Sequence, residues 1–175
     1  MKKAAVALSI AVFGVLVIAG CAKFPDKKLL AKGEQLERQE KFSEAIKAYE
    51  KLALKYPKSP LAIESLHRVA NIYTSGLQDY SRAVSVYERI TQDYPDSTKR
   101  AAQAQFMIGF VYNNYMQDTA KAHVAYEAFL AKYPTHDLAD DVQWELKYLG
   151  KDINEIPELA KATGTDKPSG QKKKK

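Results

Sequence analysis

The phrase YEKLALKYP at residues 49–57 returns as YERITQDYP at 87–95 and as YEAFLAKYP at 126–134. The prolines that end the three copies lie 38 and 39 residues apart. Self-similarity at a fixed period of this length indicates a repeat array, in which each unit buries its apolar face only by stacking on its neighbours. The repeat therefore predicts the fold, and it favours binding over chemistry as the function.

Each copy of the phrase lies on a predicted amphipathic helix that a proline ends. In the first copy, apolar residues recur at helical spacing from Ala45 to Tyr56, and Pro57 disfavours the α conformation for the residue before it. Ser59 and Pro60 are typical of an N-cap and a first helical position, so another helix follows at once. Seven helices are predicted. The first runs from about 27 to 39, the second begins near Phe42 and carries the stripe to Tyr56, the third runs from about 60 to 74, and the fourth carries Ala83 to Tyr94 before Pro95. A fifth is capped by Ser97, a sixth carries Ala122 to Tyr133 before Pro134, and a seventh extends from an Asp137 cap to Gly150.

The helix pairs resemble the tetratricopeptide repeat. A small residue in the first helix, and an alanine, a tyrosine and a final proline in the second, recur as Gly33, Ala45, Tyr49 and Pro57, as Ala70, Ala83, Tyr87 and Pro95, and as Gly109, Ala122, Tyr126 and Pro134. Small residues let helices cross closely, and the aromatic rings fill the space between pairs. The resemblance implies an all-α solenoid of three helix pairs plus a C-terminal capping helix, although the family period is usually about 34 residues.

This organisation predicts four parts in the chain. They are a signal peptide at 1–20, a lipidated N-terminus and tether at 21–28, a repeat domain at 29–161 with units at about 29–57, 60–95 and 97–134 and a cap at 137–150, and a disordered Lys-rich tail at 162–175. Because the tyrosine of each phrase recurs at one position, we expect it to pack in the core. A stacking platform for nucleic acid or glycans is the alternative.

The N-terminus is typical of a bacterial lipoprotein. Two lysines precede an apolar run at residues 4–19, about 16 residues, which is short of the roughly 20 that a membrane span needs. The run ends in Ile-Ala-Gly-Cys at 18–21, which resembles a lipobox, so Cys21 is expected to carry acyl chains and to anchor the protein. In proteobacterial lipoproteins an aspartate after the cysteine favours the inner membrane. Ala22 here favours the outer membrane, with the protein facing the periplasm.

The formal net charge of +6 comes from the chain ends. Without the two lysines of the signal and the five of the last nine residues, 20 basic residues face 21 acidic ones. The body is therefore not a basic surface of the kind that binds nucleic acid. Two interpretations of the lysine tail stay open, namely solvated disorder and contact with anionic lipid headgroups or cell-wall polymers.

No catalytic constellation is visible in the sequence. The three histidines are scattered and none has an acidic residue or cysteine at metal-ligand spacing, so we expect no enzyme activity, no metal and no cofactor. His123 falls where the other copies have Ile46 and Val84, and it is expected to be a partly buried core residue. A third kind of function, an enzyme of envelope metabolism, lacks the acid–base pair it needs.

Candidate binding residues are those of the first helix of each pair that the apolar stripe leaves over, because that helix lines the concave face in tetratricopeptide arrays. Their amide, charged and aromatic side chains suit an extended or helical peptide, with asparagines bonding its backbone and phenylalanines taking its apolar side chains. A merely solvated inner face is the alternative. The predicted peptide-binding residues are His67, Arg68, Asn71, Thr74, Phe106, Phe110, Asn113 and Asn114, with Glu34, Glu37 and Arg38 in the first unit.

A lipobox followed by stretched repeats resembles the BamD family of outer-membrane lipoproteins, which belong to the β-barrel assembly machinery. The phrases E-A-I-x-x-Y-E at 44–50 and K-Y-P-x-S-P at 55–60 carry the likeness, which extends from Cys21 to about Gly150. That family commonly has five repeats, and this chain has three and a cap. The resemblance implies a protein-binding scaffold whose partners are assembly subunits or barrel precursors. The alternative is an accessory of the Tol-Pal or peptidoglycan machinery, similar to its repeat-containing cell-division coordinator.

Overall fold

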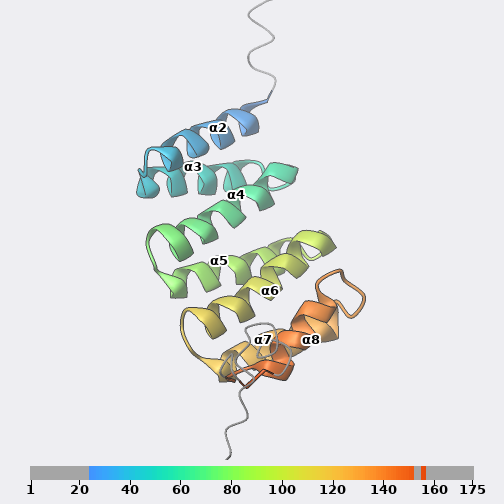
Figure 1. Cartoon of the computed structure of the whole chain (residues 1–175). Helices are drawn as coiled ribbons and strands as arrows, with labels where there is room; N and C mark the ends of the chain where they lie inside the picture. Colours follow the sequence, from blue (N-terminus) through green and yellow to red (C-terminus); the bar gives the residue numbers. More distant parts are fainter. Residues whose placement is uncertain (1–23, 152–154, 157–175) are drawn as a thin grey trace, which may run out of the picture. The chain divides into compact units, whose positions relative to one another are not determined.

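The computed structural model describes residues 24–151 and 155–156, and the regular secondary structure within these residues is entirely helical. The elements in chain order are α2 (Pro25–Arg38), α3 (Phe42–Lys55), α4 (Pro60–Asn71), a π-helical turn η2 (Ile72–Gly76), α5 (Tyr80–Asp93), α6 (Thr98–Asn114), α7 (Thr119–Lys132) and α8 (Ala139–Tyr148) (Figure 1). The predicted all-α class is confirmed. None of these helices combines the length and the apolar character that a membrane span requires.

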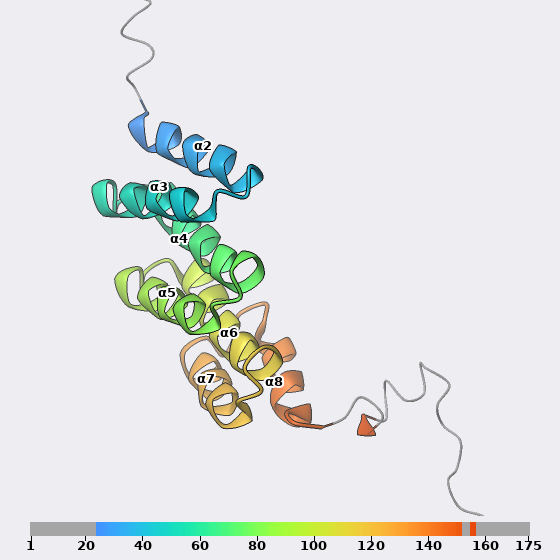
Figure 2. The ribbon, with the colours of Figure 1, turned by 90° about the vertical axis from the view of Figure 1, so that its left-hand side faces the viewer.

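The chain forms two compact units, the first ending at Ile90 and the second beginning at Thr91, inside α5. In the first unit α3 packs against both α2 and α4, and in the second α7 packs against both α6 and α8 (Figures 1 and 2). Each unit has its own apolar core, which contains Tyr49 in the first and Tyr126 and Phe129 in the second.

Helices cross closely where the repeat places glycine. A methyl group added to Gly33 would overlap the Tyr49 ring, and one added to Gly109 would overlap the Tyr126 ring. The small residue and the tyrosine of the repeat are therefore two sides of one contact, which is the packing that the sequence predicted.

The helix starts agree with the sequence in part. Ser59 caps α4 as predicted, because its Oγ accepts a hydrogen bond from the Leu61 N–H at 3.2 Å. Ser97 precedes α6, but its side chain makes no capping hydrogen bond. The predicted Asp137 cap is wrong, since α8 begins after Leu138, whose N–H donates to His136 Nδ1 at 3.1 Å.

The turns between paired helices contain a feature that the sequence analysis missed. Glu40, Gln78 and Gln117 each have φ between 53° and 57°, in the left-handed region, and they are spaced like the repeat prolines. Glycine or asparagine commonly marks such positions, and neither occurs at these three. The third helix differs from prediction as well, because its end widens into the π turn η2.

The N-terminal helix begins earlier than predicted. Pro25 takes its first position, where a missing N–H costs nothing, so residues 25–28 of the predicted tether are helical. Cys21, the signal segment and the lysine tail lie outside the described residues, as does most of the segment that follows Lys151.

Candidate functional site

The repeat tyrosines are buried, and their hydroxyl groups reach different partners. Tyr49 Oη donates to Glu37 Oε2 at 2.6 Å, and Tyr87 Oη donates to Asn71 Oδ1 at 2.9 Å. Tyr126 Oη is buried without a hydrogen bond of good geometry. All three rings are fully buried. The packing interpretation is confirmed, and none of these rings offers a face to a stacking ligand.

Of the four candidates on α4 and η2, two are buried. The His67 ring packs edge-on against Tyr87 with centroids 5.9 Å apart, and the Thr74 hydroxyl donates to the Ala70 carbonyl oxygen at 2.9 Å. The prediction that His67 and Thr74 line a binding face is therefore corrected. Thr74 lies in the π turn η2, where its side chain is buried.

Arg68 lies in an ion-pair network. Its guanidinium lies 2.9 Å from Glu34, 3.5 Å from Glu37 and 3.6 Å from Glu64, and all four side chains are about a third exposed. Burial, followed by the hydrogen bond to Glu37, raises the pKa of Tyr49. Asn71 is exposed. Arg68 thus holds α2 and α4 together, and its charge is already compensated.

The candidates in the second unit lie along α6. Phe106 packs against Tyr126 at 6.0 Å and against Phe110 at 6.1 Å, and Phe110 continues to Tyr115 at 5.9 Å. Phe106 joins the apolar core of this unit, so the expectation that it has no packing position is wrong. Phe110 is half-buried on the edge of this aromatic row.

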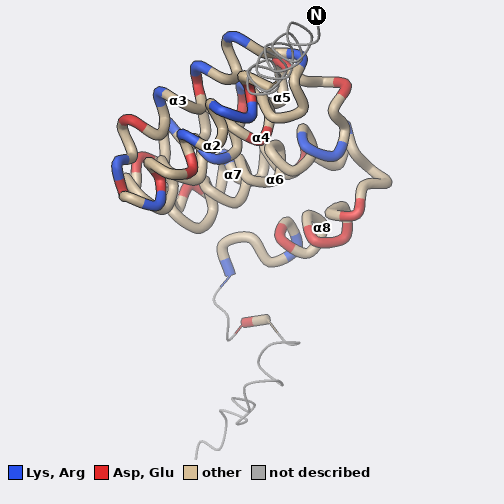
Figure 3. Tube along the Cα trace, turned by 90° about the horizontal axis from the view of Figure 1, so that it is seen from above, with Lys and Arg blue, Asp and Glu red and all other residues tan. Residues whose placement is uncertain are grey.

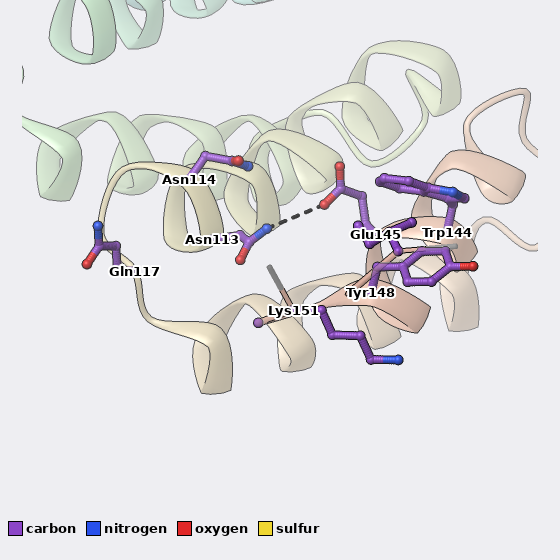
Figure 4. A pocket seen from close by; sticks show the side chains of 9 residues that line it. Asn113, Asn114, Gln117, Trp144, Glu145, Tyr148 and Lys151 are labelled. Carbon is purple, nitrogen blue, oxygen red and sulfur yellow. Dashed lines mark hydrogen bonds between the residues drawn. The ribbon is translucent and has the colours of Figure 1, made fainter. Parts of the chain in front are cut away.

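Asn113 and Asn114 border a hollow of about 350 Å³ between the end of α6 and α8, which we call the α6–α8 hollow (Figure 4). The sequence analysis assigned α8 to a cap and missed its contribution. Trp144 lies off the apolar stripe of α8 and is 42% exposed, and this was the available signal. The hollow is lined by Asn113, Asn114 and Gln117 near the end of α6, by Trp144, Glu145 and Tyr148 of α8, and by Gly150, Lys151 and Ile156.

Figure 4 shows the amide of Asn113 directed at Glu145, with the Trp144 and Tyr148 rings beside that carboxylate. The Asn113 Nδ2 atom donates to Glu145 Oε2 at 3.4 Å, and the two ring centroids are 5.1 Å apart. Lys151 lies over the Tyr148 ring at 5.4 Å from its centroid. The hollow thus combines amide groups, a carboxylate and aromatic surface.

The carboxyl group of Glu145 has a raised pKa. Burial is the main cause and the nearby Asp141 acts in the same direction, whereas the Tyr126 hydroxyl and the Asn113 amide oppose it. No described residue forms an ion pair with Glu145. The carboxylate therefore faces the hollow without a compensating cation, and it is a ready acceptor for a donor group of a ligand.

Metal chemistry finds no support in the part of the chain that the structure describes, where no group of three His, Cys, Asp or Glu side chains could hold an ion. His123 is exposed and lies 3.4 Å from Glu127, one helical turn away. The expectation of a partly buried His123 is wrong, because the helix α7 turns this position to solvent whereas Ile46 and Val84 are buried in the other copies.

Comparisons with known proteins agree with this fold. Residues 67–149 match the family model YfiO, described as outer membrane lipoprotein, and residues 29–59 match a tetratricopeptide repeat model. Among 19 solved chains that match is one described as "TPR2AB-domain:pHSP90-complex of yeast Sti1", at 22% identity and a TM-score of 0.53. That match covers 80% of this chain and 57% of the solved one, and it bears on the fold alone. No curated protein matches the chain.

The YfiO match begins at His67 in α4 and ends after α8, so it includes most of the lining of the α6–α8 hollow. The repeat match covers α2 and α3. A tetratricopeptide fold and a protein-interaction family describe a scaffold that binds proteins or peptides. Together the matches support a tetratricopeptide-repeat outer-membrane lipoprotein of the BamD/YfiO type.

Proposed function

We propose that this protein is a non-enzymatic scaffold of the outer membrane that faces the periplasm and takes part in the assembly of β-barrel proteins. The family description supports a location at the outer membrane, and the lipobox at residues 18–21 supports a lipid anchor on Cys21. Barrel-assembly subunits or unfolded barrel precursors are the proposed partners.

We propose further that the α6–α8 hollow is the site where a partner segment binds. An extended peptide presents N–H and C=O groups that must be satisfied when they leave water. Asn113 and Asn114 each use one amide N–H within the protein, toward Glu145 and toward the Phe110 carbonyl oxygen. Each amide still has a second N–H and an oxygen for a ligand, and Gln117 and the Glu145 carboxylate also line the hollow. The exposed Trp144 ring supplies apolar area for one side chain of the peptide.

A single observation carries this proposal. The half-buried Glu145 carboxylate has the Asn113 amide as a donor and the Tyr126 hydroxyl nearby, but it forms no ion pair with a described residue. It lies beside an exposed aromatic ring in a hollow of about 350 Å³. Arg68, by contrast, is already paired on three sides. Of the predicted binding residues, Asn113 and Asn114 line this hollow and are therefore the leading candidates, whereas Phe110 and Asn71 lie outside its lining and are secondary ones.

Photocrosslinking in cells tests the partner. A photoreactive residue at Asn114, which is exposed at the edge of the hollow, should capture a barrel-assembly subunit or a barrel precursor. The matched control places the same residue at Ala128, an exposed position of α7 outside the lining of the hollow. Capture of neither class of protein from position 114 would overturn the proposal. Capture of a Tol component or of cell-wall fragments would favour the alternative pathway.

Tryptophan fluorescence tests the site. Trp144 is the only tryptophan of the chain, so its emission reports on this hollow alone. An unfolded barrel precursor diluted from urea should shift the emission in a saturable way, and Asn114→Arg should weaken binding about ten-fold or more by filling the hollow. Ala128→Arg adds the same charge elsewhere and should leave the titration unchanged.

The anchor has its own test. Replacement of Cys21 by serine removes the thiol that would carry acyl chains, so Cys21→Ser should give an unprocessed or soluble protein. Membrane fractionation and the mass of the N-terminal peptide measure this. A serine variant that still fractionates with the outer membrane would exclude lipidation as the means of attachment.

A further inference from the structure

A second hollow, of about 410 Å³, lies between α2 and α3 in the first unit, and we call it the α2–α3 hollow. Its apolar lining consists of Leu29, Leu36 and Ala48. Its charged lining consists of Lys32, Lys47, Lys51 and a single acidic residue, Glu44. The hollow therefore has an apolar part and an excess of positive charge.

The acidic residues of α2 are engaged elsewhere. Glu34 and Glu37 pair with Arg68 of α4, and Asp26 accepts a hydrogen bond from the Ser59 hydroxyl at 2.7 Å. These contacts separate the charges of the helix, with carboxylates directed to α4 and lysines left beside α3. The result is a basic face that does not follow from the near-neutral charge of the protein body.

The lysines of this face have no acidic partner among the described residues. Lys28 and Lys32 are one turn apart on α2, and Lys47 and Lys51 are one turn apart on α3, so each pair projects from one side of its helix. All four are exposed, and none lies within ion-pair distance of a described carboxylate. Figure 3 shows basic positions along both helices.

The basic face lies close to the proposed anchor. Pro25, the first residue of α2, follows Cys21 by four residues, which span at most about 14 Å when fully extended. Phe24 precedes the helix, is 54% exposed, and has Lys27 Nζ 4.5 Å from its ring centroid. Aromatic and lysine side chains together are typical of the boundary between membrane and water.

We infer that the α2–α3 face binds the headgroups of anionic phospholipids in the membrane that holds the anchor. Lysines are attracted to an anionic surface within a Debye length, about 8 to 10 Å. The short connection to Cys21 keeps the start of α2 within about 14 Å of the anchored residue, so lysines of this face can come within that range. The anchor supplies the lipid surface at a fixed high local concentration, whereas a soluble anion would need affinity of its own. Glu44 lies in this lining, but three lysines outweigh it.

The inference rests on the lipid anchor of the proposed function, and it predicts a lipid-dependent protection of particular lysines. The lipidated mature chain is reconstituted in vesicles with phosphatidylglycerol and, separately, in vesicles of phosphatidylcholine alone. Lysine acetylation rates are then read by mass spectrometry. We expect Lys32, Lys47 and Lys51 to react about five-fold more slowly on the anionic vesicles, the shift that one lysine near such a surface provides. High salt should abolish the difference.

Controls separate the possible failures. The exposed residues Lys99 and Lys132 of the second unit should react equally on both vesicles. Binding by the lysine tail alone would leave Lys32, Lys47 and Lys51 unprotected, and this outcome overturns the inference. The same spectra give the mass of the Cys21 peptide, so a missing anchor is recognised separately from a face that does not bind lipid.

A charge-reversal pair provides the second test. K47E/K51E should remove the protection of Lys32, whereas K99E/K132E, which changes the net charge equally, should keep it. Glutamate favours helices about as well as lysine, and all four positions are exposed, so both variants should fold. Protection of Lys32 that survives K47E/K51E would overturn the inference.

Discussion

The same repeat contact is completed differently in the two units. Four residues after the close-contact glycine, α2 has Glu37 and α6 has Asn113. Glu37 lies 3.5 Å from Arg68 of α4, and Asn113 lies 3.4 Å from Glu145 of α8. The first unit thus pairs a carboxylate with a cation. The second pairs a carboxylate with a neutral amide.

Because of this difference, the repeat contact is structural in the first unit, whereas in the second unit it leaves a carboxylate available to a ligand. Arg68 of α4 has no cationic counterpart in α8, because the side chain that reaches Asn113 from α8 is the carboxylate of Glu145. Tyr49 Oη completes the first network, whereas Tyr126 Oη is buried without a well-formed partner. The repeat fixes the packing in both units, but Glu145 forms no ion pair with a described residue, whereas Glu37 pairs with Arg68.

The largest effect should be common to both units. Tyr49→Ala and Tyr126→Ala each remove a fully buried ring, and each should lower the free energy of unfolding by about 3 to 5 kcal/mol. Urea unfolding followed by circular dichroism measures both variants, and Trp144 emission follows the second unit alone. A clearly smaller cost for one tyrosine would show that the two contacts do not share their packing.

The next effect should be confined to the first unit. Arg68→Met leaves three carboxylates close together without a cation, and should lower the free energy of unfolding by about 1 to 2 kcal/mol. This is less than the cost of breaking a fully buried pair, because the side chains are about a third exposed.

Arg100→Met supplies the control for this experiment, because Arg100 is an exposed arginine of α6 that takes no part in the network. It should change the free energy of unfolding by less than about 0.5 kcal/mol. Raising the salt concentration screens the repulsion between the carboxylates and should reduce the cost of Arg68→Met. A cost that does not depend on salt would contradict the role of Arg68 as a compensating charge.

A smaller effect should separate the two tyrosine hydroxyl groups. Tyr49→Phe removes a hydrogen bond of 2.6 Å to a carboxylate, and should cost about 1 to 2 kcal/mol. Tyr126→Phe removes a hydroxyl without a well-formed partner, and should change the free energy of unfolding by less than about 0.5 kcal/mol. Equal costs in urea unfolding would mean that Tyr126 Oη is as well satisfied as Tyr49 Oη.

Sequence reasoning predicted the features that depend on spacing and side-chain size. The recurrence of tyrosine and proline gave the helices, and the small residue at Gly33 and Gly109 gave the close crossing, since both follow from helical periodicity. The left-handed turn residues escaped prediction, because their backbone is set by the packing of the flanking helices and not by their own preference.

The site was predicted only in part. Asn113 and Asn114 were found because they lie off the apolar stripe of α6, but Glu145 and Trp144 approach them from α8, more than 30 residues later in the chain. His67 looked like a surface residue on a helical wheel, yet it packs on Tyr87 of another helix. Contacts between helices decide both outcomes, and a single helix pattern does not contain them.

The smallest effect concerns the uncompensated carboxylate. Since the pKa of Glu145 is raised above its usual value of 4.5, the folded protein retains a proton that the unfolded chain releases. The stabilisation that comes from binding this proton is fully present below about pH 4.5, and it is lost as the pH rises through the pKa of Glu145 in the folded protein. Glu145→Gln cannot titrate, so the variant should gain stability relative to the native chain across that interval, by about 0.5 kcal/mol or less.

Urea unfolding at a series of pH values measures this gain, and Glu50→Gln, at an exposed position of α3, is the control that removes one carboxylate elsewhere. The sign of the result decides the comparison. If the variant Glu145→Gln becomes less stable than the native chain as the pH rises, the Glu145 carboxylate is compensated in the folded protein, as Glu37 is by Arg68, and the α6–α8 hollow is a structural contact. If the variant instead becomes more stable than the native chain, the folded protein contains an unfavourable charge at the position where we propose that a partner donates a hydrogen bond.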